Sequence, residues 1–489
     1  MYQKGQSDII SISGTLEEEV NFNLREILSE ECGVAAALNI PTASRCVYDS
    51  LMLQEHRGEH SAGIISLKDG EFYKHRRIGS VRDQFLDVNF DQELAGDIAM
   101  GHNRYATTGD PYSIANIQPL FFDRTRYSAL VISHNGTLID LDGVREELIS
   151  KGALFQSTTD TELMGHIITN TPSKTLEEAV IKMTKIIPAA YSAIIATSEK
   201  VIALRDKYGI RPLSIGKIKD GFLICSENYT FDQYPDCSEV EDIKAGEMIV
   251  FDNKTKQIEK IQYAEAAEHF CIFEGIYFSD PRSRYNGYWH EDFRYELGKK
   301  IYEENLDIEG DVVIPVLDSG KHAALGLAKA ANIPYKEYFR RLYNPPRSQR
   351  RSFTSVTDEE RIRTAYQKLH LRKEKIEGKR VIVMDDSIVR STTTRVINQR
   401  LREAGAKEII NCISAPPIIN VCLYGMDFQE SSQLIAHNRS IEEIQEEIGS
   451  DRLIYLSPKG LEEVAQKTYR CGICSGCFGG RYATMTSDK

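Results

Sequence analysis

Apolar and polar positions divide the chain into two parts with different periodicities. From about residue 32 to 265, short apolar runs between Gly, Asn and Asp turns predict strands, the clearest reading CGVAAALNI, SAGIISL, DIAMGHNRYA, ALVISHNG, YSAIIATS, VIALRD and FLICSE. Two stretches, near 158–170 and 175–187, have helical spacing instead. Many strands with few helices indicate an α+β layered domain.

From about residue 280, strand and helix patterns alternate. DVVIPVLDSG leads into the helical HAALGLAKAAN, KRVIVMDDS leads into TTRVINQRLREAGA, and KEIINCISAP follows as another strand. This alternation predicts a parallel sheet, whose ligands bind at the carboxyl ends of the strands. Residues 440–489 are predicted to be mainly helical before a cysteine cluster, and residues 1–31 are polar and acidic with one short helix.

Composition and charge restrict the class of protein. At roughly 100–200 residues per domain, 489 residues predict two to four domains. The net charge of −12 argues against nonspecific nucleic-acid binding. No apolar run reaches the roughly eighteen residues of a membrane helix, and the first twenty residues lack the features of a secretory signal. We therefore expect a cytoplasmic protein with no nucleic-acid or membrane partner.

The strongest motif is KRVIVMDDSIVRSTTTR, residues 379–395. An apolar strand ends in Asp385 and Asp386, and a loop of small hydroxyl residues from Ser387 to Thr394 opens a helix. Backbone N–H groups at a helix N-terminus suit a phosphate, and paired carboxylates suit sugar hydroxyls or Mg²⁺. The plain structural alternative is a capped helix after a strand. The Walker spacing is absent, and the motif resembles the phosphoribosylpyrophosphate (PRPP) signature of type I phosphoribosyltransferases.

A second turn of this kind occurs in VLDSGKHAALG, residues 316–326. The backbone amides of this turn and the ammonium of Lys321 could bind pyrophosphate, although many strand–helix turns have such residues. The basic stretch from Arg340 to Arg351 is a solvated loop or a lid over a pyrophosphate substrate.

Three polar interruptions stand out in the N-terminal part: RYATTG (104–109), SHNG (133–136) and STTDTE (157–162). Arg104 could hold a carboxylate and Asp160 an ammonium, which together would hold the two charged ends of an amino acid. The Asn135 side chain and the Gly136 N–H could form an oxyanion hole. Separately, each motif is equally consistent with a turn or a cap.

These motifs follow EECGVAAALN, in which Cys32 begins a strand. The simple reading of Cys32 is a small buried strand residue. The combination resembles the Ntn glutamine amidotransferases, whose nucleophile is an N-terminal cysteine with its own α-amine as general base. Together with the PRPP signature, and with HRGEHSAGI, RDKYGIRPLSIG, FEGIYFSDP and SAPPIINVCLYGMD, it resembles the amidophosphoribosyltransferase family from about Cys32 to Tyr482.

This resemblance implies a domain organisation. Residues 1–31 would be a propeptide removed by autocleavage, because position 32 is otherwise not a terminus. Residues 32–265 would form an Ntn-hydrolase glutaminase domain with four αββα layers, and 266–440 a type I phosphoribosyltransferase α/β domain. Residues 441–489 would be a C-terminal helical segment with cluster cysteines.

The ten cysteines are too sparse for a disulfide scaffold, and three of them cluster in RCGICSGCFGG. From the spacing alone, zinc and iron–sulfur are about equally consistent. The resemblance favours a [4Fe–4S] cluster on Cys271, Cys422, Cys474 and Cys477, with Cys471 close by but not a ligand.

The resemblance also implies the reaction and its residues. Glutamine and PRPP would be substrates of the first committed step of purine biosynthesis, with purine nucleotides as feedback inhibitors and a homotetramer or homodimer as the assembly. The implied residues are, for catalysis, Cys32, Asn135 and Gly136; for glutamine, Arg104, Thr107 and Asp160; for PRPP, Asp318, Ser319, Gly320, Lys321, Arg351, Lys368, Asp385, Asp386, Ser387, Ser391, Thr392 and Thr393; and for Mg²⁺, Ser319, Asp385 and Asp386.

Two alternative functions remain open on these residues. One is a diverged amidotransferase that delivers ammonia in a side pathway. The other is a non-catalytic iron–sulfur regulator that binds PRPP or nucleotides.

Overall fold

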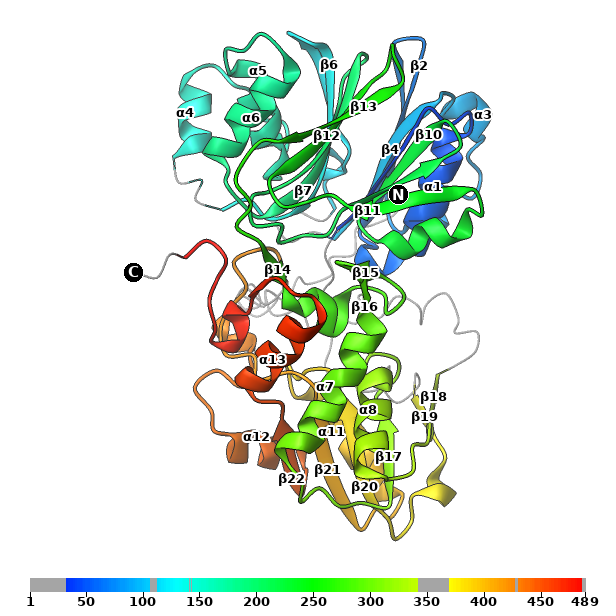
Figure 1. Cartoon of the computed structure of the whole chain (residues 1–489), viewed down its shortest axis with the longest axis vertical. Helices are drawn as coiled ribbons and strands as arrows, with labels where there is room; N and C mark the ends of the chain where they lie inside the picture. The colour runs from blue at the N-terminus through cyan, green and yellow to red at the C-terminus, as the bar shows by residue number, and fades with distance from the viewer. Residues whose placement is uncertain are drawn as a thin grey trace, which may run out of the picture.

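The computed structural model describes residues 32–105, 112–139, 141, 143–341, 369–426 and 430–485. These residues form two halves stacked end to end, with the N-terminal half at the top of Figure 1 and the C-terminal half below it.

The N-terminal half contains two antiparallel sheets. The seven-stranded sheet has the order β11 (Cys237–Asp242), β9 (Ser214–Ile218), β10 (Gly221–Cys225), β1 (Gly33–Leu38), β4 (Ile98–Arg104), β2 (Ser61–Lys68) and β3 (Glu71–Ile78). The six-stranded sheet has the order β13 (Gln257–Gln262), β12 (Glu247–Asp252), β8 (Lys200–Arg205), β7 (Tyr191–Ala196), β6 (Ser128–Gly136) and β5 (Leu120–Thr125).

The burial pattern of β1 shows how these sheets are layered. All six of its residues are buried, because both faces of the sheet are covered. Val34 and Leu38 pack in the core between the two sheets, whereas Ala35 and Ala37 pack in a core with α1 (Ala43–Leu53) on the outer face. On the six-stranded sheet, α4 (Val144–Ser150), α5 (Thr161–Asn170) and α6 (Leu176–Ile186) cover the opposite outer face. The predicted four-layer αββα arrangement is confirmed.

The C-terminal half is built on a parallel sheet of order β17 (Val312–Pro315), β20 (Arg380–Asp385), β21 (Glu408–Ile413) and β22 (Arg452–Tyr455). Its helices are α7 (His290–Glu304), α8 (Lys321–Ala331), α11 (Thr392–Glu403), α12 (Ile441–Ile448) and α13 (Pro458–Thr468). The predicted α/β domain is confirmed. Helices α7 and α8 approach closely at Gly298, where a Cβ atom would lie 1.8 Å from the carbonyl oxygen of Ala323.

Among the elements that the pattern missed are α1 and β22. The helix α1 was not predicted, because its short apolar stripe of Ala43, Val47 and Leu51 lies among Ser, Cys and Tyr residues that favour no single element. Residues 441–489 are not only helical, because β22 forms the edge of the parallel sheet. Its four residues are too few to show an alternating pattern.

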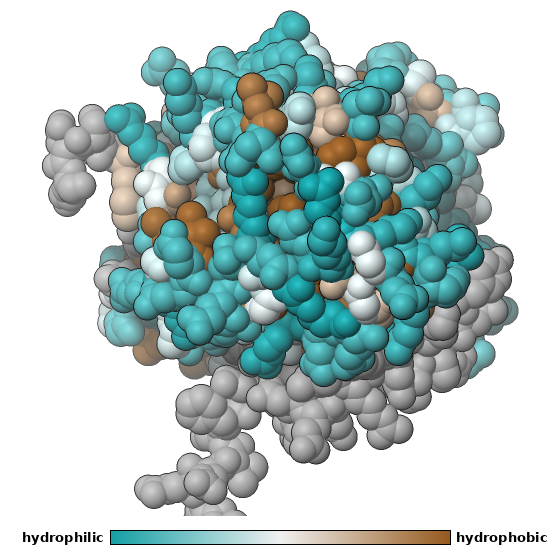
Figure 2. Space-filling view, turned by 90° about the horizontal axis from the view of Figure 1, so that it is seen from below, coloured by the Kyte–Doolittle hydropathy of each residue, from teal (hydrophilic) through white to brown (hydrophobic). Residues whose placement is uncertain are grey.

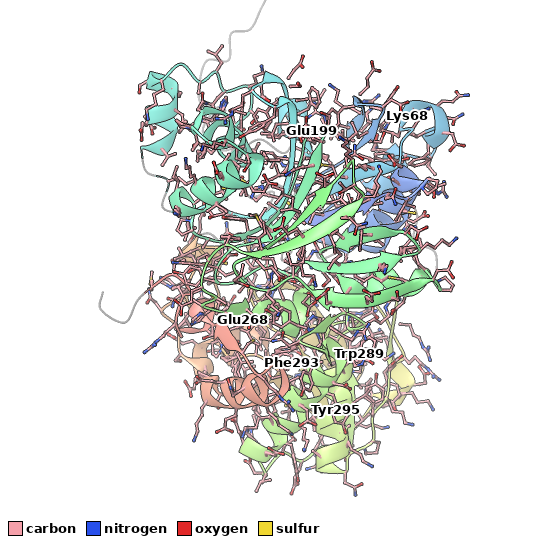
Figure 3. All side chains as sticks on the ribbon, turned by 45° about the horizontal axis from the view of Figure 1, so that its top comes forward. Lys68, Glu199, Glu268, Trp289, Phe293 and Tyr295 are labelled. Carbon is pink, nitrogen blue, oxygen red and sulfur yellow. The ribbon has the colours of Figure 1, made fainter. Side chains whose placement is uncertain are left out.

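The two halves join where the chain passes from β13 into β14 (His269–Cys271). Backbone N–H groups of Ala267 and His269 donate to the carbonyls of Lys207 and Tyr208, at 2.8 and 2.7 Å. In Figure 3, Glu268 and Trp289 lie beside this junction, whereas Lys68 and Glu199 lie at the far end of the N-terminal half.

Seen from below, on the side of the C-terminal half, the surface is mostly hydrophilic with scattered apolar side chains (Figure 2). Among the described residues, no helix combines the length and the apolar character that crossing a membrane requires.

Candidate active site

The predicted nucleophile lies directly before the central strand of the seven-stranded sheet. Cys32 immediately precedes β1, whose first residue, Gly33, pairs with Asn103 of β4. The thiol is 8% exposed, and its Sγ lies 3.5 Å from the carbonyl oxygen of Tyr105. Arg57 donates from Nε to the carbonyl oxygen of Cys32 at 3.2 Å. The backbone of Cys32 is thus fixed by a buried cation.

The predicted oxyanion pair lies at the end of β6 in the facing sheet. His102 of β4 contacts the carbonyl oxygen of His134 through Nε2 at 3.0 Å, which brings the two strands together. Asn135 is fully buried, and neither its Oδ1 nor its Nδ2 has a hydrogen-bond partner among the described residues. Since a buried amide without partners is costly, the unused donor of Asn135 fits a ligand oxygen.

Gly136 completes this pair. Its φ of 135° favours glycine, and a Cβ atom here would lie 2.0 Å from the carbonyl oxygen of Ala190. The structure therefore requires glycine at the position that was predicted to donate an N–H.

The structure describes two of the three residues that were predicted to bind the substrate amino acid, Arg104 and Asp160. Arg104, at the end of β4, is buried. Asp160 is half-buried, and its Oδ2 accepts a hydrogen bond from the Leu138 N–H at 3.0 Å and lies 3.8 Å from Nε2 of His134. Thr107 lies outside the described residues. The sequence did not single out His134, whose pKa is lowered by burial although Asp160 opposes the shift.

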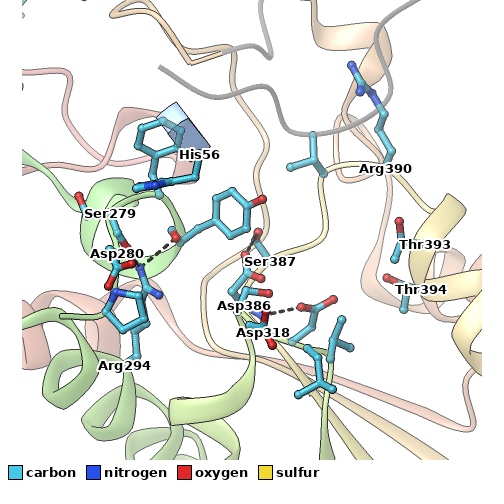
Figure 4. A pocket seen from close by; sticks show the side chains of 18 of the residues that line it. His56, Ser279, Asp280, Arg294, Asp318, Asp386, Ser387, Arg390, Thr393 and Thr394 are labelled. Carbon is cyan, nitrogen blue, oxygen red and sulfur yellow. Dashed lines mark hydrogen bonds between the residues drawn. The ribbon is translucent and has the colours of Figure 1, made fainter. Parts of the chain in front are cut away.

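A cavity of about 390 Å³ opens at the carboxyl ends of β17 and β20 (Figure 4). Predicted PRPP residues in its wall are Asp318, Ser319, Asp385, Asp386, Ser387, Thr392 and Thr393. Gly320, Lys321 and Ser391 are not in the wall: a Cβ atom on Gly320 would lie 2.3 Å from the Met384 carbonyl, and Lys321 pairs with Glu337 at 3.5 Å. Arg351 and Lys368 lie outside the described residues.

Several other wall residues were not assigned as site residues, although all but Arg294 lie in segments that the sequence analysis quoted. They are His56, Tyr277, Phe278, Ser279, Asp280, Pro281, Arg294, Val316, Leu317, Val389, Arg390 and Thr394. His56 comes from the N-terminal half and faces the cavity across from the acidic pair (Figure 4). Its HRG segment was noticed only as part of the family resemblance, because no local pattern could show that a loop of one half closes a pocket of the other.

The acidic pair, Asp385 and Asp386, lies where the charged form of both carboxyls is disfavoured. Burial raises the pKa of Asp385 well above its usual range, and the adjacent charge of Asp386 adds to the shift. Burial also raises the pKa of Asp386, although hydrogen bonds from Ser319 and Ser387 oppose it. Two buried carboxyls with raised pKa values favour a proton, a cation or donor hydroxyls between them. Mg²⁺ commonly takes one or two carboxylates and completes its shell with phosphates and waters, so this pair fits it.

The four predicted cluster cysteines come together from three segments. Cys271 of β14 is directly opposite Cys474 of the parallel strand β23 (Gly472–Cys474). Burial raises the pKa of Cys477, and the charges of Cys422, Cys271 and Cys474 raise it further. Cys471 has other neighbours, Glu268 and Arg205. Among the described residues, no three Cys, His, Asp or Glu side chains converge tightly enough to hold a single metal ion. Four clustered thiols suit the softer and larger iron–sulfur group.

Comparison with known proteins shows similarity over both halves of the chain. Residues 102–233 match a family model described as a glutamine amidotransferase domain. The chain is 35% identical over 460 residues to the amidophosphoribosyltransferase of Bacillus subtilis, covering 94% of this chain and 95% of the relative. It is 35% identical over 472 residues to that of Synechocystis sp., covering 94% and 92%.

The solved structures give the same result. The glutamine PRPP amidotransferase from B. subtilis, complexed with ADP and GMP, matches with a TM-score of 0.84 and 34% identity, over 94% of this chain and 99% of that chain. A structure described as the allosteric regulatory enzyme of purine biosynthesis matches with a TM-score of 0.85 and 33% identity, over 94% and 97%. Because the similarity extends over both halves and both sites, the chain belongs to the amidophosphoribosyltransferase family.

Proposed function

We propose that this protein converts glutamine, PRPP and water into 5-phosphoribosylamine, glutamate and pyrophosphate, the first committed step of purine biosynthesis. It is accordingly a pentosyltransferase with glutamine amidotransferase activity. The observation that carries this function is that one chain combines three features: a buried cysteine before β1, a buried and unpartnered Asn135 amide at the end of β6, and a pocket that ends in two adjacent carboxylates.

In the glutaminase half, the Cys32 thiol gives its proton to the α-amine of the same residue and Sγ attacks the side-chain amide carbon of glutamine. The oxygen of the tetrahedral intermediate accepts hydrogen bonds from the Asn135 amide and the Gly136 N–H. The C–N bond then breaks, the α-ammonium returns its proton to the leaving ammonia, and water hydrolyses the thioester to glutamate. This route needs a free amine on Cys32, so we include removal of residues 1–31 in the proposal.

Glutamine itself is held at its charged ends. Arg104 binds the α-carboxylate and the half-buried Asp160 binds the α-ammonium. Thr107 is assigned to the same substrate on the family resemblance alone.

In the phosphoribosyl half, Asp385 and Asp386 accept hydrogen bonds from the ribose hydroxyls. Ser387, Thr392 and Thr393 hold the 5-phosphate at the start of α11, and Asp318 and Ser319, in the turn before α8, hold the pyrophosphate. Gly320, Lys321 and Ser391 are assigned to PRPP on the family resemblance alone. The lone pair of ammonia attacks C1 while the C1–O bond breaks and its electrons leave with pyrophosphate. When bound, Mg²⁺ would neutralise charge on the pyrophosphate, and Ser319, Asp385 and Asp386 are the residues placed to hold it. Arg351 and Lys368 are assigned to PRPP on the resemblance alone.

We assign a structural role to the cysteine site. Cys271, Cys422, Cys474 and Cys477 would hold a [4Fe–4S] cluster, which would join β14, β23 and the loop at 422. The B. subtilis structure was solved with ADP and GMP, and from it we extend feedback by purine nucleotides to this chain. A cytoplasmic homotetramer or homodimer completes the proposal.

One assay tests the function. Anaerobically purified protein is given glutamine with and without PRPP and Mg²⁺, and glutamate, pyrophosphate and the mass of the N-terminus are measured. We expect glutamate release that depends on PRPP. Release that ignores PRPP would favour the diverged amidotransferase, and no release from a chain that begins at Cys32 would favour the binding protein.

A further inference from the structure

One short segment connects the phosphoribosyl pocket to the buried core of the junction. It begins at β14 and continues into a π-helical turn, Glu274–Phe278, followed by Ser279, Asp280 and Pro281. The pocket is lined by Tyr277, Phe278, Ser279, Asp280 and Pro281, whereas Glu274 is fully buried and is not part of the lining. A π-helical turn is frequently found at a functional site, and this one has a buried carboxylate at its start and pocket-lining residues at its end.

Glu274 receives hydrogen bonds from both halves of the molecule. Arg57 of the glutaminase half donates to its two carboxylate oxygens, at 2.8 and 3.1 Å. Ser279, in the pocket wall, donates its hydroxyl to Oε2 at 2.6 Å. Nη1 of Arg211 lies 3.6 Å from Oε1. The carboxylate thus joins a pocket residue to two cations of the other half.

Arg57 carries the connection to the nucleophile. The same guanidinium that pairs with Glu274 donates from Nε to the Cys32 carbonyl at 3.2 Å and lies 4.5 Å from the centre of the Phe278 ring. Its exposure is 0%, so these bonds are not screened by water. Two charged side chains, Arg57 and Glu274, therefore link the pocket wall to the Cys32 backbone through hydrogen bonds.

A second buried carboxylate, Glu227, also links Arg57 to the pocket wall. Glu227 accepts from Arg57 Nη1 at 2.7 Å and contacts Nε2 of His56 at 2.7 Å. It also accepts from the Asp280 N–H at 2.8 Å and the Ser283 hydroxyl at 2.9 Å. Burial would raise the pKa of Glu227, but His56 and Arg57 outweigh it and hold this pKa well below its usual range.

We propose that Glu274 is a positioning residue that, through Arg57, aligns the Cys32 nucleophile according to the state of the phosphoribosyl pocket wall. The inference rests on the proposed function, because it assigns to these residues the coupling of its two half-reactions. A buried ion pair is by itself weak evidence for a contribution to stability. Here the pair has direct hydrogen bonds to the pocket wall at one end and to the nucleophile's own carbonyl at the other.

The test replaces Glu274 with glutamine, which retains an oxygen to accept from Ser279 but removes the charge that orients Arg57. Pyrophosphate release is measured at saturating PRPP with glutamine and, separately, with ammonium chloride. Glutamate release without PRPP is measured in parallel. The matched control is Glu304→Gln, since Glu304 also accepts from a serine, Ser457, but lies at the far end of α7.

We expect Glu274→Gln to lower the ratio of glutamine-driven to ammonia-driven pyrophosphate release at least about fivefold, the lower end of typical coupling between sites. Ammonia-driven release stays near the wild-type value, and Glu304→Gln leaves the ratio unchanged. The loss appears in kcat for glutamine more than in KM, because Glu274 does not touch the substrate.

Other results would overturn the assignment. An unchanged ratio in Glu274→Gln, or equal loss of both activities, means that the pair only stabilises the junction. If Glu274→Gln does not fold, Ser279→Ala decides, because it removes the hydroxyl that donates to Glu274 and leaves the Glu274–Arg57 ion pair in place. An unchanged ratio there also refutes the coupling. Wild-type protein with neither activity would instead refute the proposed function, and with it this inference.

Discussion

The backbone N–H of Asp386 donates to the carboxylate of Asp385 at 2.9 Å, where β20 ends in the wall of the pocket. Both carboxyls are almost completely buried, and both pKa values are raised. The charged pair therefore opposes folding at neutral pH, and a ligand that donates hydrogen bonds or brings positive charge lowers this cost.

Replacing Asp386 with asparagine should lower the activity without lowering the thermal stability of the protein. We expect ammonia-driven pyrophosphate release to fall on the order of 10²-fold, because charge-assisted bonds to ribose hydroxyls are lost. Thermal unfolding of the ligand-free protein should occur at the same or a higher temperature, because one of two like charges is removed. Full activity in the variant would show that the ribose site lies elsewhere.

Asn135→Ala tests the oxyanion pair. The kcat of glutamine hydrolysis should drop about 10²- to 10³-fold, as is typical when one oxyanion donor is removed. Ammonia-driven pyrophosphate release should be retained, since it bypasses the glutaminase site. Equal loss in both assays would mean that Asn135 supports the fold and not the intermediate.

Glycine at position 136 has a matched control at position 152. Both have positive φ, but a Cβ atom on Gly152 meets nothing within 4 Å, whereas on Gly136 it would clash with the Ala190 carbonyl. Gly152→Ala should cost roughly 1–2 kcal/mol of the free energy of unfolding, from the backbone alone. Gly136→Ala should cost roughly 1–3 kcal/mol more and abolish glutamate release. Equal costs, measured by denaturant unfolding, would contradict this geometry.

The acid stability of the protein should depend on His290. Burial lowers the pKa of this imidazole to about 3, and the charge of Arg294 adds to the effect. The imidazole of the unfolded chain takes up a proton near its usual pKa of 6.5, whereas that of the folded chain does not until about pH 3. The contribution of His290 to stability is therefore fully present above pH 6.5 and is lost as the pH falls toward 3.

His290→Gln keeps a polar group near the Tyr469 hydroxyl, which lies 2.6 Å from Nδ1 of the histidine. Free energies of unfolding at several pH values between 3 and 7 should show a shallower fall on acidification in the variant than in the wild type. Parallel curves would mean that His290 takes up its proton at the same pH in the folded and the unfolded chain.

Cys474→Ser and Cys471→Ser should differ in iron content. Cys474 lies opposite Cys271 in the β14–β23 pair, whereas the electrostatic neighbours of Cys471 are Glu268 and Arg205. Under anaerobic purification, we expect Cys474→Ser to lose iron and visible absorption and Cys471→Ser to keep both. Loss in both variants would assign Cys471 as a ligand, and iron-free wild-type protein would refute the cluster.

Local patterns predicted the parts of each site that come from one strand and its following loop. The strand ends at Asp385 and Asn135 could be read directly, because an apolar run followed by polar residues shows where a buried strand reaches an edge of its sheet. The helix α1 and the strand β22 were missed, because their residues have weak intrinsic preferences and become ordered by packing against neighbouring sheets.

The connection between the two sites was decided by the tertiary structure. Arg57 and Glu274 are 217 positions apart, and neither lies in a pattern that predicts a partner. His56 likewise enters the wall of a pocket that belongs to the other half. The sequence by itself determined the chemical groups, Cys32 and the two aspartates, because their types and immediate neighbours are local properties of the chain. Only the packed structure decided which buried charges meet, because a desolvated ion pair forms where long-range packing excludes water around both partners.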